Sequence, residues 1–107
     1  MSRSKYYWYM HVVRVLHRYP DGLGNSIQDS IARSAINRAI ADTAKLRDGE
    51  ERLKLINLIY WNNGRVNRVG AAMQMFISET TAKRWDNAFI HLVAEYMGFG
   101  NVDLKLH

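Results

Sequence analysis

Two helical patterns meet across a very short connection in the last third of the chain. The first pattern ends near Gln74, the connection is Met75-Phe76-Ile77, and the second pattern begins at Ser78. Serine suits this position because its hydroxyl can accept a hydrogen bond from an unpaired backbone N–H one turn further on. A short helix, a tight turn and a longer helix form the helix-turn-helix pattern, whose second helix enters the major groove of DNA.

The longer helix of this segment has two chemically different sides when it is projected at roughly 100° per residue. Its apolar side, which needs a core, consists of Trp85, Phe89, Leu92, Val93 and Tyr96. Its polar stripe consists of Thr80, Lys83, Arg84, Asn87 and His91. Arginine and lysine suit guanine edges or phosphates and asparagine suits adenine, so the stripe predicts contact with DNA. An ordinary surface helix would show the same residue types on its solvated side.

The charge balance is basic, with 15 Lys+Arg against 10 Asp+Glu and a formal net charge of +5. This favours a polyanionic partner, nucleic acid first, although ribosomal or membrane-surface partners fit the same charge. The absence of cysteine excludes disulfides, thiol catalysis and sulfur-ligated zinc. No apolar run approaches the roughly 20 residues of a membrane span, and no signal peptide is evident. We therefore expect a cytoplasmic protein that does not bind a membrane.

The N-terminal region, residues 1–47, predicts two helices, at 4–18 and 26–46, joined by a turn at 19–24 that holds the only proline. One apolar face of the first helix consists of Trp8, Val12, Val15, Leu16 and Tyr19, and a second of Tyr6, Met10 and Val13. The apolar seam of the next helix consists of Ile27, Ile31, Ala35, Ile36, Ala39, Ile40 and Thr43. Both helices are interpreted as core elements, with self-association or docking of another protein as the alternative.

The C-terminal region, residues 48–107, begins with a predicted capping box in which Asp48 caps and Glu51 reaches back. The helix expected at 50–61 is apolar almost all round, so it should be central. Asn62-Asn63-Gly64 should end this helix, and Asn67 should cap the next one. Gly70 inside that helix suggests the close approach of a neighbouring helix. All of this predicts an all-α, five-helix domain, compact overall and ending in the helix-turn-helix.

The segment from Glu51 to Gly98 resembles the C-terminal region of the RinA and ArpU families of phage transcriptional regulators, whose helix-turn-helix is similar to region 4 of sigma factors. The most specific block runs from Ser78 to Trp85, Ser-Glu-Thr-Thr-Ala-Lys-Arg-Trp, followed by Phe89 and Leu-Val-Ala at 92–94. Leu-Ile-Asn-Leu-Ile-Tyr-Trp at 55–61 and Val-Gly-Ala-Ala-Met at 69–73 also carry the resemblance. The N-terminal half matches only loosely.

The resemblance implies a sequence-specific DNA-binding regulator, an activator of phage or prophage genes. It places the recognition-helix positions at Thr80, Thr81, Lys83, Arg84 and Asn87, with Ala72 and Trp85 in packing positions. Lys83, Arg84 and Asn87 are expected to face base edges, and Thr80, Thr81, Arg65 and Arg68 to face phosphates. Many such motifs have glycine in the turn, where this chain has Phe76. Because a bulky residue disfavours positive φ, we expect a different backbone shape or a longer turn.

No catalytic or metal-binding pattern is present: the four histidines lack ligand spacing, no glycine-rich phosphate loop opens a helix, and no Ser/His/Asp set is readable. We therefore expect neither an enzyme nor a cofactor. Two alternatives to a regulator stay open: an assembly protein such as a phage small terminase subunit, and a protein-interaction module that keeps the fold. A single module buries only about 600–1,000 Å² on DNA, so specificity argues for two copies or help from RNA polymerase.

Overall fold

The computed structural model describes residues 6–61 and 66–99, and these residues form five α-helices and no strand. The α-helices are α1 (Tyr9–Arg18), α2 (Ile27–Ala44), α3 (Gly49–Ile56), α4 (Arg68–Met75) and α5 (Glu79–Tyr96). A 3₁₀ turn (Tyr19–Asp21) follows α1, and a π-helical turn (Asn57–Trp61) continues α3. The predicted all-α domain of five helices is confirmed. No described helix has the length and apolarity that crossing a membrane requires.

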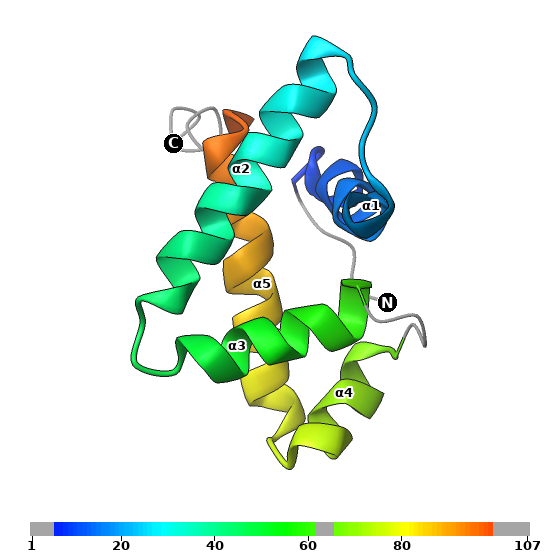
Figure 1. Ribbon diagram of the computed structural model, residues 1–107. Coiled ribbons are helices and arrows are strands. Elements are labelled where there is room, and N and C mark those ends of the chain that lie inside the picture. The colour runs from blue at the N-terminus through cyan, green and yellow to red at the C-terminus, as the bar shows by residue number, and fades with distance from the viewer. Residues whose placement is uncertain (1–5, 62–65, 100–107) are drawn as a thin grey trace.

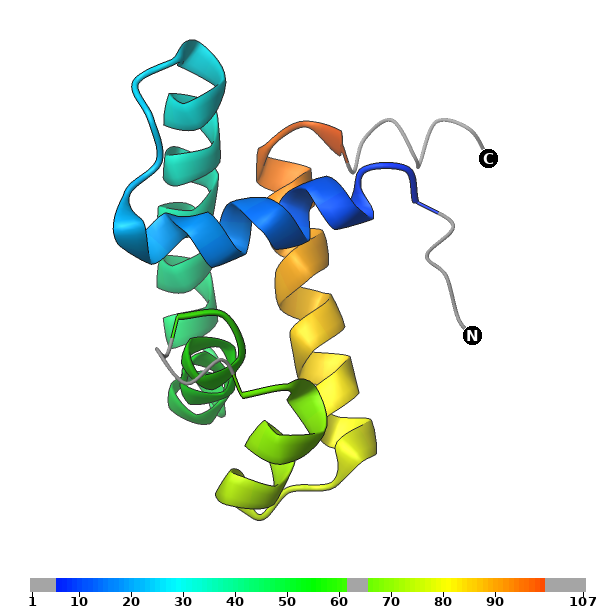
Figure 2. The same ribbon diagram turned by 90° about the vertical axis from the view of Figure 1, so that its right-hand side faces the viewer.

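The two longest helices, α2 and α5, pack side by side along the molecule, and the other helices are arranged across them (Figure 1). Seen after a quarter turn, α1 runs across α2 and α5, while α4 and the beginning of α5 form the lower end of the molecule (Figure 2). The core lies where these helices meet. It includes Leu16, Ile36, Leu55 and Ile90, which are fully buried.

Helix α1 begins at Tyr9 and not at residue 4, because Tyr6 to Trp8 form a turn in which aromatic rings pack together. The rings of Tyr6 and Trp8 stack with their centroids 5.0 Å apart. The predicted main apolar face is confirmed as buried core at Trp8, Val12, Val15 and Leu16. On the second predicted face, Tyr6 and Val13 are partly buried against the core, whereas Met10 is exposed.

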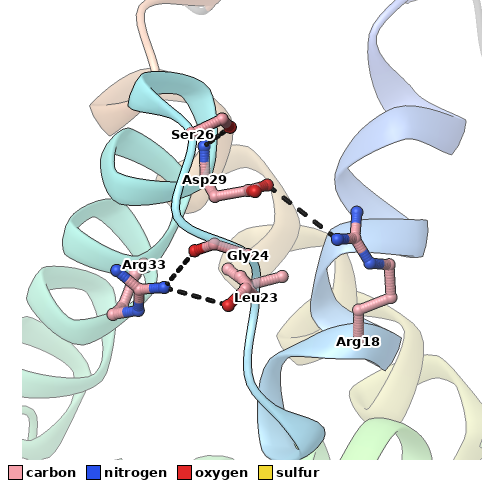
Figure 3. A network of polar contacts seen from close by, with 6 residues as sticks. All are labelled: Arg18, Leu23, Gly24, Ser26, Asp29 and Arg33. Carbon is pink, nitrogen blue, oxygen red and sulfur yellow. Dashed lines mark hydrogen bonds and ion pairs between the residues drawn. The ribbon is translucent and has the colours of Figure 1, made fainter.

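The connection between α1 and α2 is held by side chains of both helices (Figure 3). Arg33 of α2 donates from Nη2 to the backbone carbonyls of Leu23 (3.2 Å) and Gly24 (2.8 Å). At the start of α2, Ser26 accepts from the backbone N–H of Asp29 at 3.0 Å, as predicted for an N-cap. Arg18 lies 3.9 Å from Asp29, an exposed pair that adds little stability.

The apolar seam predicted for α2 is only partly correct. The buried positions are Ala32, Ala35, Ile36, Ala39 and Thr43. Ile27, which is 81% exposed, and Ile31 lie outside this stripe. Helical spacing alone placed them with the core residues, but the buried stripe begins only at Ala32.

Helix α3 begins at a corner that requires glycine. A Cβ on Gly49 would lie 2.1 Å from the carbonyl oxygen of Thr43, far inside van der Waals contact. The predicted capping box is wrong: the Asp48 side chain makes no cap bond and pairs instead with Arg52 Nε at 2.9 Å. The expected central position of this helix is confirmed, because Leu55 and Ile56 are fully buried. The predicted stop at Asn62-Asn63-Gly64 lies outside the described residues.

Helix α4 is capped as predicted, with Asn67 accepting from the backbone N–H of Gly70 at 2.7 Å. The prediction that Gly70 marks the close approach of a neighbouring helix is wrong. A Cβ there would lie 2.9 Å from Cγ1 of Val66 and 3.2 Å from Oδ1 of Asn67, so glycine makes room for the cap and not for another helix. The close packing of α4 against its neighbours instead falls on Ala71 and Ala72, which are buried.

The turn between α4 and α5 corrects the expectation for Phe76, which adopts the left-handed conformation with φ 57° and ψ 41°. Its backbone N–H donates to the carbonyl of Met73 (3.2 Å), and that of Ile77 donates to the carbonyl of Ala72 (3.0 Å). These are the two bonds of a Schellman C-cap. They satisfy carbonyls at the helix end and offset a conformation that costs a non-glycine residue about 1–2 kcal/mol.

Variants with glycine or alanine at position 76 should therefore differ in their free energy of unfolding. The Phe76 side chain is 94% exposed, so removing the ring alone in Phe76→Ala should change the free energy of unfolding little. Phe76→Gly should be more stable than Phe76→Ala by about 1 kcal/mol, because glycine adopts positive φ without a Cβ clash. Urea denaturation of the two variants measures the difference. Equal stabilities would show that the turn carries no backbone strain.

Candidate functional site

A cleft lies between α4 and the first turns of α5, at the lower end of the molecule in Figures 1 and 2. It has a volume of about 320 Å³ and is lined by Arg68, Val69, Glu79, Thr80 and Lys83. The short Schellman turn places the start of α5 directly beside α4, and the cap at Ser78 fixes where α5 begins. The cleft thus brings together two cations, one hydroxyl and one carboxylate from the two helices.

The first two turns of α5 present three of the predicted site residues to solvent. Thr80, Lys83 and Arg84 are all exposed. Thr81 is half-buried, and it takes part in the cap: its backbone N–H donates to Ser78 Oγ (3.0 Å), and its own Oγ1 accepts from that hydroxyl (2.9 Å). Ser78 is confirmed as the N-cap. Thr81 therefore acts first in holding the start of the helix.

The second half of the predicted stripe is engaged within the protein. Oδ1 of Asn87 accepts a hydrogen bond from the Tyr9 hydroxyl at 2.9 Å, which joins α5 to the start of α1. The ring of His91 meets the rings of Tyr6 and Trp8 edge to face, with centroids 4.9 and 5.1 Å away. Asn87 is half-buried, whereas His91 stays exposed although its ring contacts Tyr6 and Trp8.

A buried carboxylate that the sequence interpretation missed connects the walls of the cleft. Asp86 of α5 is 4% exposed and accepts from the Tyr60 hydroxyl (2.6 Å) and from Arg68 Nη1 (3.0 Å). Tyr60 belongs to the π-helical turn and Arg68 to α4, so Asp86 joins three elements. A signal was available in the sequence, because Asp86 falls in helical step with Ala82 and Ile90, which are core residues.

The electrostatics of this network follow from its burial. Loss of hydration raises the pKa of the Asp86 carboxyl above its ordinary 3.8, while the hydrogen bonds from Tyr60 and Arg68 and the positive charge of Arg68 oppose the rise. Burial, and then the neighbouring Asp86 charge, raise the pKa of the Tyr60 hydroxyl, so it stays a proton donor. Asp86 holds one nitrogen of the Arg68 guanidinium group, and the Arg68 side chain remains partly exposed at the cleft.

One predicted site residue, Arg65, lies outside the described residues. Within the described ranges, no group of three or more His, Asp or Glu side chains is arranged to hold a metal ion. The cleft and the start of α5 offer Lys83, Arg84 and an Arg68 that pairs with Asp86, against the carboxylate of Glu79. The small excess of positive charge and the hydrogen-bond donors suit the binding of an anionic polymer.

Comparison of the chain with protein-family models, with curated proteins and with solved structures found no match. The resemblance of the segment from Glu51 to Gly98 to phage regulators therefore stays a prediction from the sequence.

Replacing Arg68 with methionine should make stability depend more strongly on pH in the acid range. Without the cation, the pKa of Asp86 should rise further, so its charged form becomes more costly in the folded state. A raised folded-state pKa means that stability falls as pH rises from the ordinary pKa of the unfolded chain to the raised value. We expect Arg68→Met to cost about 2 kcal/mol at neutral pH and much less near pH 4.

Denaturation of Arg68→Met and its parent between pH 4 and 7 measures this dependence. The matched control is the effect of Arg68→Met in an Asp86→Asn background, where no carboxyl group titrates and the loss should vary little with pH. A loss that is the same at every pH in the Asp86 background would show that the ion pair does not set the ionisation of this group.

Proposed function

We propose that this chain is a sequence-specific DNA-binding transcription regulator that reads the major groove with the beginning of α5. The observation that carries the proposal is the joint exposure of Thr80, Lys83 and Arg84 on the first two turns of α5, beside a cleft that also holds Arg68. The net charge of +5 supports a polyanionic partner. The major groove is about 12 Å wide and admits one α-helix.

The contact of α1 with the middle of α5, and not with its first two turns, supports this mode of binding. In helix-turn-helix proteins, residues at the N-terminal end of the second helix contact base edges, while the preceding helix lies across the backbone. Here α4 and the start of α5 form one end of the molecule, and α1 crosses α5 further along (Figure 2). This arrangement would let the start of α5 enter a groove without a clash from α1.

Each exposed residue then has a distinct role. Lys83 and Arg84 supply donors for guanine edges, where a good contact is worth about 1–3 kcal/mol of discrimination. Thr80 and Arg68 supply donors to the phosphates that flank the groove. Asn87 is assigned a different role from the one predicted for it: bonded to Tyr9, it orients α1 against α5.

The resemblance to the RinA and ArpU families supports phage or prophage genes as the regulated targets. It also supports RNA polymerase as a further partner, because a small module gains useful occupancy from a second contact. No feature of the described structure favours the packaging alternative over a regulator.

Selection of bound duplexes from a random DNA pool tests the proposal. We expect the parent to enrich a defined motif, and the double variant Lys83→Ala/Arg84→Ala to bind that motif at least about tenfold more weakly, because base-edge donors are lost. Arg14→Ala, which removes an exposed cation from α1, is the matched control and should keep the motif. If the parent enriches nothing, sequence-specific binding is ruled out.

Salt dependence distinguishes phosphate contacts from base contacts in the same material. The logarithm of the association constant should fall linearly with the logarithm of salt concentration, by about 0.9 for each phosphate contacted. Arg68→Met should reduce this slope by about one without changing which motif is preferred. An unchanged slope would remove Arg68 from the interface, and binding that ignores salt would favour a protein-interaction module.

A further inference from the structure

Three exposed apolar side chains line the outer side of α4 and its turn, and we call them the α4 patch: Val69, Met73 and Phe76. They are 45%, 71% and 94% exposed, respectively. Val69 and Met73 are four residues apart and therefore on one side of α4, and Phe76 follows in the turn directly after the helix ends. Single exposed apolar residues are ordinary, but three within one short segment indicate a binding surface.

Phe76 also has an unusual backbone conformation. It is the only non-glycine residue of the described chain with positive φ, a conformation that glycine or asparagine would adopt at lower cost. Its ring contributes nothing to the core, because it is almost completely exposed. A residue held in a costly backbone conformation without a benefit to the fold points to a benefit elsewhere.

The position of the patch connects it to the proposed DNA-binding surface. Val69 belongs to the patch and also lines the cleft with Arg68 and Lys83. Anything bound to the patch would therefore lie beside the bound DNA. The other exposed apolar pair, Ile27 and Ile31, lies on the first part of α2, which Figures 1 and 2 show at the opposite end of the molecule.

The size of the patch restricts what can occupy it. Its three side chains expose on the order of 400 Å², about half of the roughly 800 Å² per partner that a stable protein interface buries. The charges beside it are largely balanced, because Arg68 pairs with Asp86 and Glu79 lines the same cleft as Lys83. An apolar surface of this size pairs only weakly in free solution, whereas a duplex that carries two copies holds them at a high effective concentration.

We propose that the α4 patch docks against the same patch of a second copy when both copies are bound to one duplex. The proposal rests on the proposed function. A row of similar apolar side chains is self-complementary, as a two-fold interface requires. Pairing on DNA also gives a small module the added specificity of a double site, while the weak patch keeps free copies separate.

Cooperative occupancy of double sites provides the test. Fluorescein-labelled duplexes would carry one or two inverted copies of the motif that the parent enriches, with the centre-to-centre spacing varied in single base pairs over two helical turns. The parent should fill the second site about 10–100-fold more readily than the first at one preferred spacing. Phe76→Gly and Met73→Ser should lose most of this factor and keep the single-site affinity of the parent.

Two properties of the variants make the loss of cooperativity specific to the α4 patch. Phe76→Gly relieves the backbone at position 76, so a loss of cooperativity cannot be attributed to a damaged turn. Ile31→Ser removes a side chain as exposed as Val69 but on α2, and it should leave cooperativity intact. Sedimentation without DNA should show a monomer at micromolar concentration.

The outcomes separate this proposal from the proposed function. Single-site binding with independent filling at every spacing overturns the pairing and leaves the DNA-binding function standing. Failure of the parent to bind a single site overturns both. A fall in single-site affinity on Phe76→Gly would assign the patch to the DNA itself, and a stable dimer without DNA would show that pairing does not depend on it. Either result overturns the proposal.

Discussion

A buried carboxylate holds the end of the molecule that carries the candidate site. Asp86 accepts hydrogen bonds from Tyr60 and Arg68, so it fixes α5 to the π-helical turn and to α4 at once. An unpaired charge at this depth would cost several kcal/mol, so both partners stabilise the packing around Asp86. Because α4 has just eight residues and little core of its own, this polar contact adds to Ala71 and Ala72 in setting its position on α5.

The same helix, α5, serves two purposes along its length. Its middle is joined to the start of α1 by the bond between Tyr9 and Asn87 and by the rings around His91. Its first two turns carry no such cover, and they expose Lys83 and Arg84. An amphipathic pattern cannot show this division, because the polar residues continue at the same helical spacing through both halves. The contact with α1, which comes from the far end of the sequence, creates it.

Local chemistry was predictable from the sequence, and long-range contacts were not. Ser78 was identified as an N-cap correctly because a cap depends on residues within one turn. Asp48 fits a cap equally well by sequence, but its carboxylate pairs with Arg52 four residues on, so competing partners within one turn can also defeat a local prediction. In the candidate site, exposure was predicted correctly for Lys83, whereas Asp86 was missed because its partners lie 18 and 26 residues away in the sequence.

At Phe76, the rule that a bulky residue disfavours positive φ is right about the energetic cost but does not predict the conformation. Positive φ is unfavourable for phenylalanine, yet the Schellman bonds and the half-buried Ile77 hold the backbone there. Glycine would meet the same geometry at lower cost, so fold stability alone does not account for the aromatic ring. Natural proteins commonly lose some stability at positions where a surface has to bind something. In this chain, Phe76 exposes its ring at the end of the helix that also exposes Val69 and Met73, and Val69 lines the cleft.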